Sequence, residues 1–313
     1  MLNLIVQRLL ATIAVMAVVG VVVFLLVHLA PGDPAVVIAG DTASAQEVAA
    51  IRAKLRLDDP LPRQFITWAG NILRGDLGQS IFSDLPVAQL ISQRLWPTLS
   101  LAALTLVFAV STAVAIGVAA ARRPGSWVDR TVMIGAVLSF SVPVFVVGYA
   151  LIYLFALKLQ WLPVQGYRPM ADGIGAWLRH LILPSVTLGL AYLALIARIT
   201  RAAMLDVLAE DYMRTARAKG VSEPSQHWKH ALRNAGVPIL TVIGIGVALL
   251  IGGVVITETV FNIPGMGRLM VDAITKRDYP VIQGVILIFS GLYVLINLAV
   301  DLAYGLIDPR IRV

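Results

Sequence analysis

The chain contains no cysteine and few charged residues. Without cysteine, it forms no disulfide, thiolate metal site or cysteine nucleophile. Charged residues make up 14% of the sequence and hydrophobic residues 58%, whereas a soluble domain carries about 25% charged residues. The mean hydropathy is +0.84. Because positions facing lipid need no polar cover, this composition predicts a membrane protein with several spans.

Motifs for hydrolysis or nucleotide binding are also missing from the sequence. It contains no HExxH, no GxSxG and no GxxxxGK[ST] phosphate loop. His227 and His230 lie three residues apart, but no carboxylate or third ligand accompanies them. We therefore expect no catalytic residue, metal site or cofactor in this chain, and we expect that it is not an enzyme.

Six apolar runs are present, each near the 20 residues needed to cross about 30 Å of hydrocarbon. They cover residues 9–29, 98–121, 132–157, 180–197, 238–257 and 281–304. The first follows Arg8, but its apolar core is longer than that of a signal peptide, and no small-x-small cleavage site follows it. The sequence therefore predicts an all-α polytopic membrane protein with six transmembrane helices.

Charges are rare in the middle of these spans. His28, Arg198, Glu258 and Asp301 fall at or near span ends, where they are expected to reach the membrane interface. An ion-coupled carrier is expected to place charges at mid-membrane depth. The pattern therefore argues against a secondary transporter.

Basic residues gather in two of the connections between spans. They are Arg122, Arg123 and Arg130 in the second connection, and Arg198, Arg201, Arg214, Arg217, Lys219, Lys229 and Arg233 in the fourth. The positive-inside rule places both connections, and with them both termini, in the cytoplasm. This distribution also explains the net charge of +7 without a nucleic-acid partner.

The segment 31–96 then lies outside the cytoplasm. Ser44 or Thr42 is expected to cap a short helix that ends at residue 55. Residues 62–73 predict a second, amphipathic helix with Phe65, Trp68, Ala69 and Ile72 on one face. We interpret the segment as a small helical insert whose aromatic residues serve as interfacial anchors and packing residues.

Proline and glycine interrupt several spans. Pro143, Pro184 and Pro238 can kink helices or expose backbone carbonyls. Gly244, Gly246, Gly252 and Gly253 give the fifth span a surface of small residues. That surface fits either close helix packing or a pore-lining helix that moves against its partner, and the sequence leaves both roles open.

Between the fourth and fifth spans lies a long polar, basic stretch, residues 211–238. Residues 198–219 have a helical pattern that continues the fourth span, and Gly220 suits the left-handed position that closes a helix. Ser222 is expected to cap a second helix, up to residue 234, with Trp228 at its middle. Such a helix either rests on anionic lipid or docks into a cytoplasmic partner. We favour docking, because its bases are spread around it and a central tryptophan resembles an interface anchor.

This stretch carries a resemblance to a known family. YMRTARAKGVSE followed by KHALRNAGVP resembles the cytoplasmic EAA loop of ABC importer permeases, in the variant of the dipeptide, oligopeptide, glutathione and nickel transporters. FLLVHLAPGDPA, LDDPLPRQFITWAGNILRGDLGQS, ETVFNIPGMGRLMVDAI and RDYPVIQG extend it from the first span to the last. Arg214, Thr215 and Ala216 stand where the general pattern has Glu-Ala-Ala, and Pro238 lies farther from Gly220. Both departures match the peptide-type variant.

The resemblance implies a type I importer permease. Residues 1–30 would be an N-terminal transmembrane helix, 31–96 the extracytoplasmic insert, 97–304 the transmembrane core with a coupling loop at 198–237, and 305–313 a cytoplasmic tail. The implied ATPase-coupling residues are Arg214, Thr215, Ala216, Lys219, Gly220, Ser222, Glu223, Gln226, His227 and Trp228. Pro143, Pro184, Gly244, Gly246, Gly252 and Gly253 are the candidate gating or packing residues.

The implied partners are a second, non-identical permease, two ABC ATPase subunits that bind ATP and Mg²⁺, and an extracytoplasmic substrate-binding protein. The implied location is the bacterial inner membrane. Peptides are the favoured substrates with glutathione close behind, and nickel or another small solute is the alternative within the family. A self-sufficient channel or carrier and an intramembrane enzyme are the alternatives from other classes.

Overall fold

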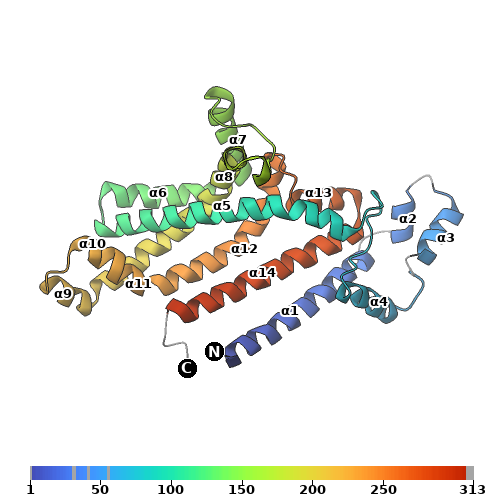
Figure 1. Cartoon of the computed structure of the whole chain (residues 1–313), viewed down its shortest axis with the longest axis horizontal. Helices are drawn as coiled ribbons and strands as arrows, with labels where there is room; N and C mark the ends of the chain where they lie inside the picture. Colours follow the sequence, from blue (N-terminus) through green and yellow to red (C-terminus); the bar gives the residue numbers. More distant parts are fainter. Residues whose placement is uncertain (1, 30–32, 41–42, 55–56, 308–313) are drawn as a thin grey trace. The chain divides into compact units, whose positions relative to one another are not determined.

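The computed structural model describes residues 2–29, 33–40, 43–54 and 57–307. Within these ranges the chain is helical, and its only strand-like pairing is an isolated antiparallel bridge between Gln79 and Pro86. It divides into two compact units, one of residues 1–96 and 265–294 and one of residues 97–264 and 295–313. The helices α5 (Val87–Arg122) and α14 (Tyr279–Ile307) contribute to both units (Figure 1).

In the described part, four helices are long and apolar enough to cross a membrane. These segments are Leu10–Leu29, Val87–Arg122, Ile174–Ala209 and Tyr279–Leu302. Two bent pairs, Trp127–Ser141 with Val144–Lys158 and Glu223–Asn234 with Gly236–Val247, raise the number to six if each pair is one span. The prediction of an all-α membrane protein is confirmed, with the span count between four and six.

The predicted third span, 132–157, is not one continuous helix. The helix α6 (Trp127–Ser141) and the following α7 (Val144–Leu151), with its π-helical extension η1 (Ile152–Lys158), meet at 107° (Figure 1). Pro143 has no N–H to donate and disfavours helical backbone at Val142, which is extended with ψ of 123°. Pro143 therefore breaks the chain as expected, whereas Pro184 lies inside an uninterrupted helix α8 (Ile174–Ala209).

The first unit contains α1 (Leu2–Leu29), α2 (Pro34–Ala39), α3 (Ala45–Lys54), α4 (Leu61–Leu73) and α13 (Met266–Lys276), with the adjoining parts of α5 and α14. Ser44 caps α3: its hydroxyl oxygen accepts the N–H of Glu47 at 3.3 Å, and the Glu47 carboxylate accepts the Ser44 N–H at 2.7 Å. That second bond holds the pKa of Glu47 below its usual range. The alternative cap, Thr42, lies outside the described residues.

The helix α4 matches the predicted amphipathic helix. Phe65 and Trp68 contact Phe24 of α1, with ring centroids 5.3 and 5.6 Å apart. Farther along, the buried Asp278 accepts the hydroxyl of Ser80 at 2.6 Å and the N–H of Ile81 at 3.3 Å. These contacts join the insert to the start of α14.

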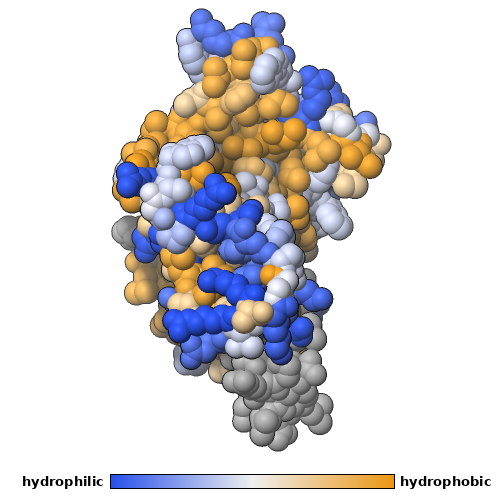
Figure 2. Space-filling view, turned by 90° about the vertical axis from the view of Figure 1, so that its left-hand side faces the viewer, coloured by the Kyte–Doolittle hydropathy of each residue, from blue (hydrophilic) through white to orange (hydrophobic). Residues whose placement is uncertain are grey.

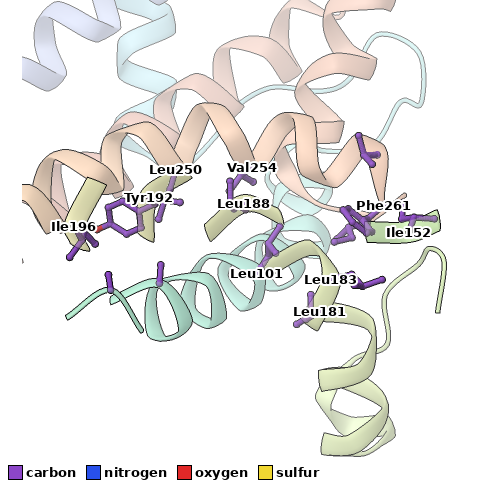
Figure 3. Close-up of a cluster of buried hydrophobic side chains, with 14 of the residues drawn as sticks. Leu101, Ile152, Leu181, Leu183, Leu188, Tyr192, Ile196, Leu250, Val254 and Phe261 are labelled. Atoms are coloured by element: carbon purple, nitrogen blue, oxygen red, sulfur yellow. The ribbon is translucent and has the colours of Figure 1, made fainter. Parts of the chain in front are cut away.

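In the second unit, α8 packs against α6, α7 and α12 (Gly236–Val260). Figure 3 shows the core formed by these helices and α5, with Leu101, Leu188, Tyr192, Ile196, Leu250, Val254 and Phe261 among its buried side chains. Glu258, which was expected near a span end, lies two residues before the end of α12. It is fully buried and accepts the hydroxyl of Thr98 at 2.5 Å.

The glycines of α12 differ in their surroundings. A Cβ atom at Gly246 would lie 1.6 Å from Cε2 of Tyr192, and one at Gly253 would lie 2.5 Å from Cδ1 of Leu188. A Cβ atom at Gly244 would lie 3.0 Å from Cγ1 of Val300, whereas one at Gly252 would meet nothing within 4 Å. Gly246 and Gly253 therefore allow α8 and α12 to approach closely, and Gly252 lies on an open face.

Candidate functional site

The basic stretch begins with a break in the helix. The predicted continuous helix over 198–219 is wrong: α8 ends at Ala209, Glu210 is extended with ψ of 148°, and α9 covers Asp211–Ala218. The break turns α9 so that Met213 is fully buried in an apolar cluster with Val118, Met204, Ala231 and others. Burial of this side chain stabilises the turned position of α9.

The end of α9 has the conformation expected at Gly220. Its φ is +75°, in the left-handed region that favours glycine. The N–H of Gly220 donates to the carbonyl of Arg217 at 2.9 Å, and that of Val221 donates to Ala216 at 3.1 Å. These two bonds make a Schellman motif, which satisfies carbonyls at the end of the helix. The prediction of a helix closed by Gly220 is confirmed.

The second helix covers Glu223–Asn234 as expected, but its middle is irregular. One turn of α-helix (α10, Glu223–Ser225) is followed by a π-helical turn (η3, Gln226–Ala231) and by α11 (Leu232–Asn234). Ser222 has the extended backbone of a capping residue, yet its side chain makes no capping hydrogen bond. The expected side-chain cap at Ser222 is therefore wrong, and proline at position 224 sets the start of the helix instead.

Two of the predicted coupling residues are buried. Gln226 and His227 are each 6% exposed. The Gln226 amide donates to the carbonyl of Val221 at 2.6 Å and its oxygen accepts from Nε of Arg217 at 3.2 Å. Nδ1 of His227 lies 2.8 Å from the carbonyl oxygen of Glu223. These side chains hold the turn between the two helices and do not face outward.

The other predicted coupling residues form an outward surface, which we call the coupling surface. It consists of Arg214, Thr215, Lys219, Gly220, Ser222, Glu223 and Trp228, all exposed. Trp228 is 49% exposed, and Ala216 is half-buried at the edge of the surface. Figure 2 shows this end of the second unit, where hydrophilic residues gather over the segment from α9 to α11.

The coupling surface is attached to the apolar helices at several points. Met213, Ala231 and Ala235 pack into one cluster with residues of α5, α8 and α12. Arg122 at the end of α5 pairs with Glu223 at 3.2 Å, and the Asn234 amide donates to the Tyr212 hydroxyl at 2.8 Å. The segment that carries the coupling surface is therefore packed against the ends of three long helices.

An ion pair beside this surface escaped sequence reasoning. Arg201 of α8 holds Asp129 of α6 through two nitrogens, with Nη2 donating to Oδ2 at 2.7 Å. The side chain of Asp129 is 5% exposed, and the carboxylate also accepts the N–H of Gly125 at 2.9 Å. From the sequence alone, Arg201 was treated only as one of the positive charges of a cytoplasmic connection. No local sequence pattern relates Arg201 to Asp129, which is 72 positions away.

The candidate gating residues lie apart from the coupling surface. Pro143 lies at the bend between α6 and α7, and Pro184 lies within α8. A cavity of about 190 Å³ between these helices is lined by Leu138, Val142, Val144 and Thr187 among others. Among the described residues, no cluster of three histidine, cysteine, aspartate or glutamate side chains is placed to hold a metal ion.

Comparisons with known proteins cover the whole chain. Residues 113–313 match the family model described as binding-protein-dependent transport system inner membrane component, and residues 1–102 match the model of the N-terminal part of such a membrane component. A probable peptide ABC transporter permease of Sinorhizobium fredii is 61% identical over 308 residues, which are 98% of each chain. The glutathione transport system permease protein GsiC of Escherichia coli K12 is 49% identical over 312 residues, 100% of this chain and 99% of that protein.

A solved structure shares the fold. It is an inward-facing conformation of the MetNI methionine ABC transporter, with a TM-score of 0.57 and 19% identity over 70% of this chain and 97% of the other.

Proposed function

Because the chain belongs to the family of binding-protein-dependent transport system inner membrane components, we propose that it forms one half of the translocation pathway of an ATP-driven peptide importer. The resemblance found in the sequence is thereby confirmed, and the chain is a multi-pass membrane permease subunit rather than an enzyme. A relative named for peptides and one named for glutathione, itself a peptide, support a peptide substrate.

The observation that carries the mechanism is the coupling surface. It is exposed, closed by the Schellman motif at Gly220, and packed onto the ends of α5, α8 and α12. We infer that two ATPase subunits, which bind ATP and Mg²⁺, supply the energy, and that one docks on this surface. Closure of the ATPases would move α9 to α11, and Met213 and Ala231 would transmit the movement to the long helices.

The remaining partners follow from the same scheme. A second, non-identical permease completes the pathway, and an extracytoplasmic binding protein delivers the substrate. The basic loops support an inner-membrane orientation with both termini cytoplasmic. In this orientation the domain scheme stays as proposed from the sequence, with the coupling loop at 198–237. Of the tail at 305–313, residues 308–313 lie outside the described residues.

Reconstitution tests the proposal directly. Peptide uptake into liposomes should require this chain, its partner permease, the ATPases, ATP and the binding protein together. Uptake by the purified chain alone would contradict the proposal and would favour a self-sufficient channel or carrier.

Replacing Gly220 with valine should uncouple ATP hydrolysis from transport. A β-branched residue at φ of +75° costs about 1–2 kcal/mol in the left-handed region and would open the turn that orients the second helix. Uptake and ATP hydrolysis in proteoliposomes measure the effect, and Gly220→Asn should retain most transport because asparagine tolerates this conformation.

Gly125→Val serves as the matched control for strain at Gly220. Gly125 has φ of +78° and, like Gly220, no atom within 4 Å of a Cβ position, but it lies outside the coupling loop. If Gly220→Val transported peptide as well as wild type, or if both valine variants lost transport equally, the coupling role of Gly220 would be wrong.

Truncation of Trp228 should weaken docking of the ATPases. Removing a half-exposed tryptophan that becomes buried on docking costs about 2 kcal/mol, or roughly 30-fold in affinity. Affinity of the detergent-purified permease pair for the ATPases measures the loss for Trp228→Ala. Lys229→Ala, an exposed neighbour, should change it little, and equal affinity for both variants would contradict the anchor role of Trp228.

A further inference from the structure

One cavity lies within the first unit, which does not contain the coupling surface. It has a volume of about 490 Å³, and its lining includes residues at the end of α1, on α4 and at the start of α14. Figure 1 shows these three helices. Its lining includes Phe24, His28, Gln64, Trp68, Asn71 and Gln283. A volume of this size is in the range of pockets that hold a drug-sized ligand.

Hydrogen bonds between the three helices fix the walls. Nε1 of Trp68 donates to Oε1 of Gln283 at 3.2 Å, and the Gln283 amide donates to the carbonyl of Val23 at 3.1 Å. Nε2 of His28 lies 3.1 Å from Oε1 of Gln64, whose amide donates to the carbonyl of Asp59 at 2.8 Å. Because these polar groups bond to one another, they shape the cavity and leave recognition to other residues.

The charged side chains that line the cavity are acidic. Asp59 and Asp76 line it, and the described lining residues include no lysine or arginine. Asp59 pairs with Arg63, whose Nε is 3.9 Å from Oδ2, and Arg63 does not line the cavity. Asp76 accepts one hydrogen bond through Oδ1, from the N–H of Gly78 at 2.9 Å. Its second oxygen remains available to a ligand.

Aromatic rings also form part of the cavity wall. Phe24, Trp68 and Tyr279 also line the cavity, and aromatic faces attract cations through the ring quadrupole. Two carboxylates beside aromatic rings select a guanidinium or ammonium group and repel an anion.

We propose that this cavity receives a lysine or arginine side chain on a loop of the extracytoplasmic substrate-binding protein. The inference rests on the proposed function, which places the insert outside the cytoplasm. One basic side chain does not fill the cavity, so part of the loop that carries it enters as well. The pair of aspartates fixes the orientation of the docked protein, and the aromatic walls bury the stem of the basic side chain.

Binding measurements with the complete transporter in nanodiscs test this proposal. The permease pair with its ATPases is titrated with fluorescently labelled binding protein at low and at moderate salt. The double variant Asp59→Asn/Asp76→Asn should bind about tenfold more weakly at low salt and should show a flatter salt dependence. Asp58→Asn is the matched control, because Asp58 is the neighbouring residue, is 71% exposed and does not line the cavity.

A second variant keeps both carboxylates. Asn71→Lys places an ammonium group at the cavity wall, where it should occupy the site of the incoming base and weaken docking at least as much. Asn71→Gln should bind as wild type. ATP hydrolysis without binding protein should be unchanged in all variants, which shows that the assembly is intact.

The outcomes separate the inference from the proposed function. Wild-type affinity in both the double aspartate variant and Asn71→Lys would overturn the cavity as a docking site. If the wild-type transporter did not bind the protein at all, the proposed function itself would fail.

Discussion

Adding one methyl group at Gly246 should destabilise the protein by about 2 kcal/mol or more, because overpacking a tight contact costs about 1–3 kcal/mol. The new Cβ atom would lie 1.6 Å from Cε2 of Tyr192 and 2.7 Å from its Cζ. The ring cannot move away freely, since Tyr192 is 4% exposed and its hydroxyl donates to the carbonyl of Ile243 at 2.6 Å. Either α8 and α12 separate or this hydrogen bond is lost.

Gly252→Ala provides the control on the same helix. A Cβ atom there meets nothing within 4 Å, so the substitution should be neutral or should stabilise the helix by up to about 1 kcal/mol. Thermal unfolding of the purified protein in detergent compares the two variants. Tyr192→Leu should partly rescue Gly246→Ala by making space, which a double-mutant cycle would detect. Equal unfolding midpoints for Gly246→Ala and Gly252→Ala would contradict the contact.

Removal of the carboxylate of Asp129 is the second change with a large expected effect. Asp129→Ala leaves Arg201, whose side chain is 22% exposed, without its paired oxygens, and the Gly125 N–H loses its acceptor. Breaking a buried ion pair by removing one partner costs about 3–5 kcal/mol. Because Arg201 reaches some solvent, we expect a loss near the lower end, about 3 kcal/mol.

Thermal unfolding and the yield of membrane-inserted protein measure this effect. Asp211→Ala is the control, since Asp211 pairs with Arg214 at 3.2 Å but its side chain is 93% exposed, and such pairs contribute little. Arg201→Met combined with Asp129→Ala should recover much of the loss, because a buried pair is replaced by apolar groups. No recovery in the double variant would show that the two residues act separately.

The membrane helices were predictable because their signal is the length of an apolar run. The bends of these helices were harder to predict. Proline at position 143 indicates a break, but the angle of 107° between α6 and the following α7 with η1 depends on packing against α8. The helices α2 and α13 were missed. Asp33 caps α2 by accepting the N–H of Ala35 at 3.0 Å, but the helix has only six residues, too few to show a periodic pattern. The break at Glu210 was also hidden, because the helical pattern continues on both sides of it.

At the candidate site, Gly220 was predictable because only its backbone freedom explains a glycine at that point. Gln226 and His227 were counted among the coupling residues because the family resemblance covers the whole short helix. They are buried because the π-helical turn directs them toward the carbonyls of Val221 and Glu223. The pairing of Asp129 with Arg201 depends on tertiary structure, which no local pattern encodes.

The composition of the first unit has a consequence for the order of biosynthesis. Residues 1–96 form this unit together with residues 265–294, and Asp278 and Gln283 supply bonds to Ser80 and Trp68. At about 5–20 residues per second, the ribosome needs roughly 10–30 s to make the intervening segment. During that interval Ser80 and Trp68 lack these partners, so the first unit cannot complete its packing until residues 265–294 have been made.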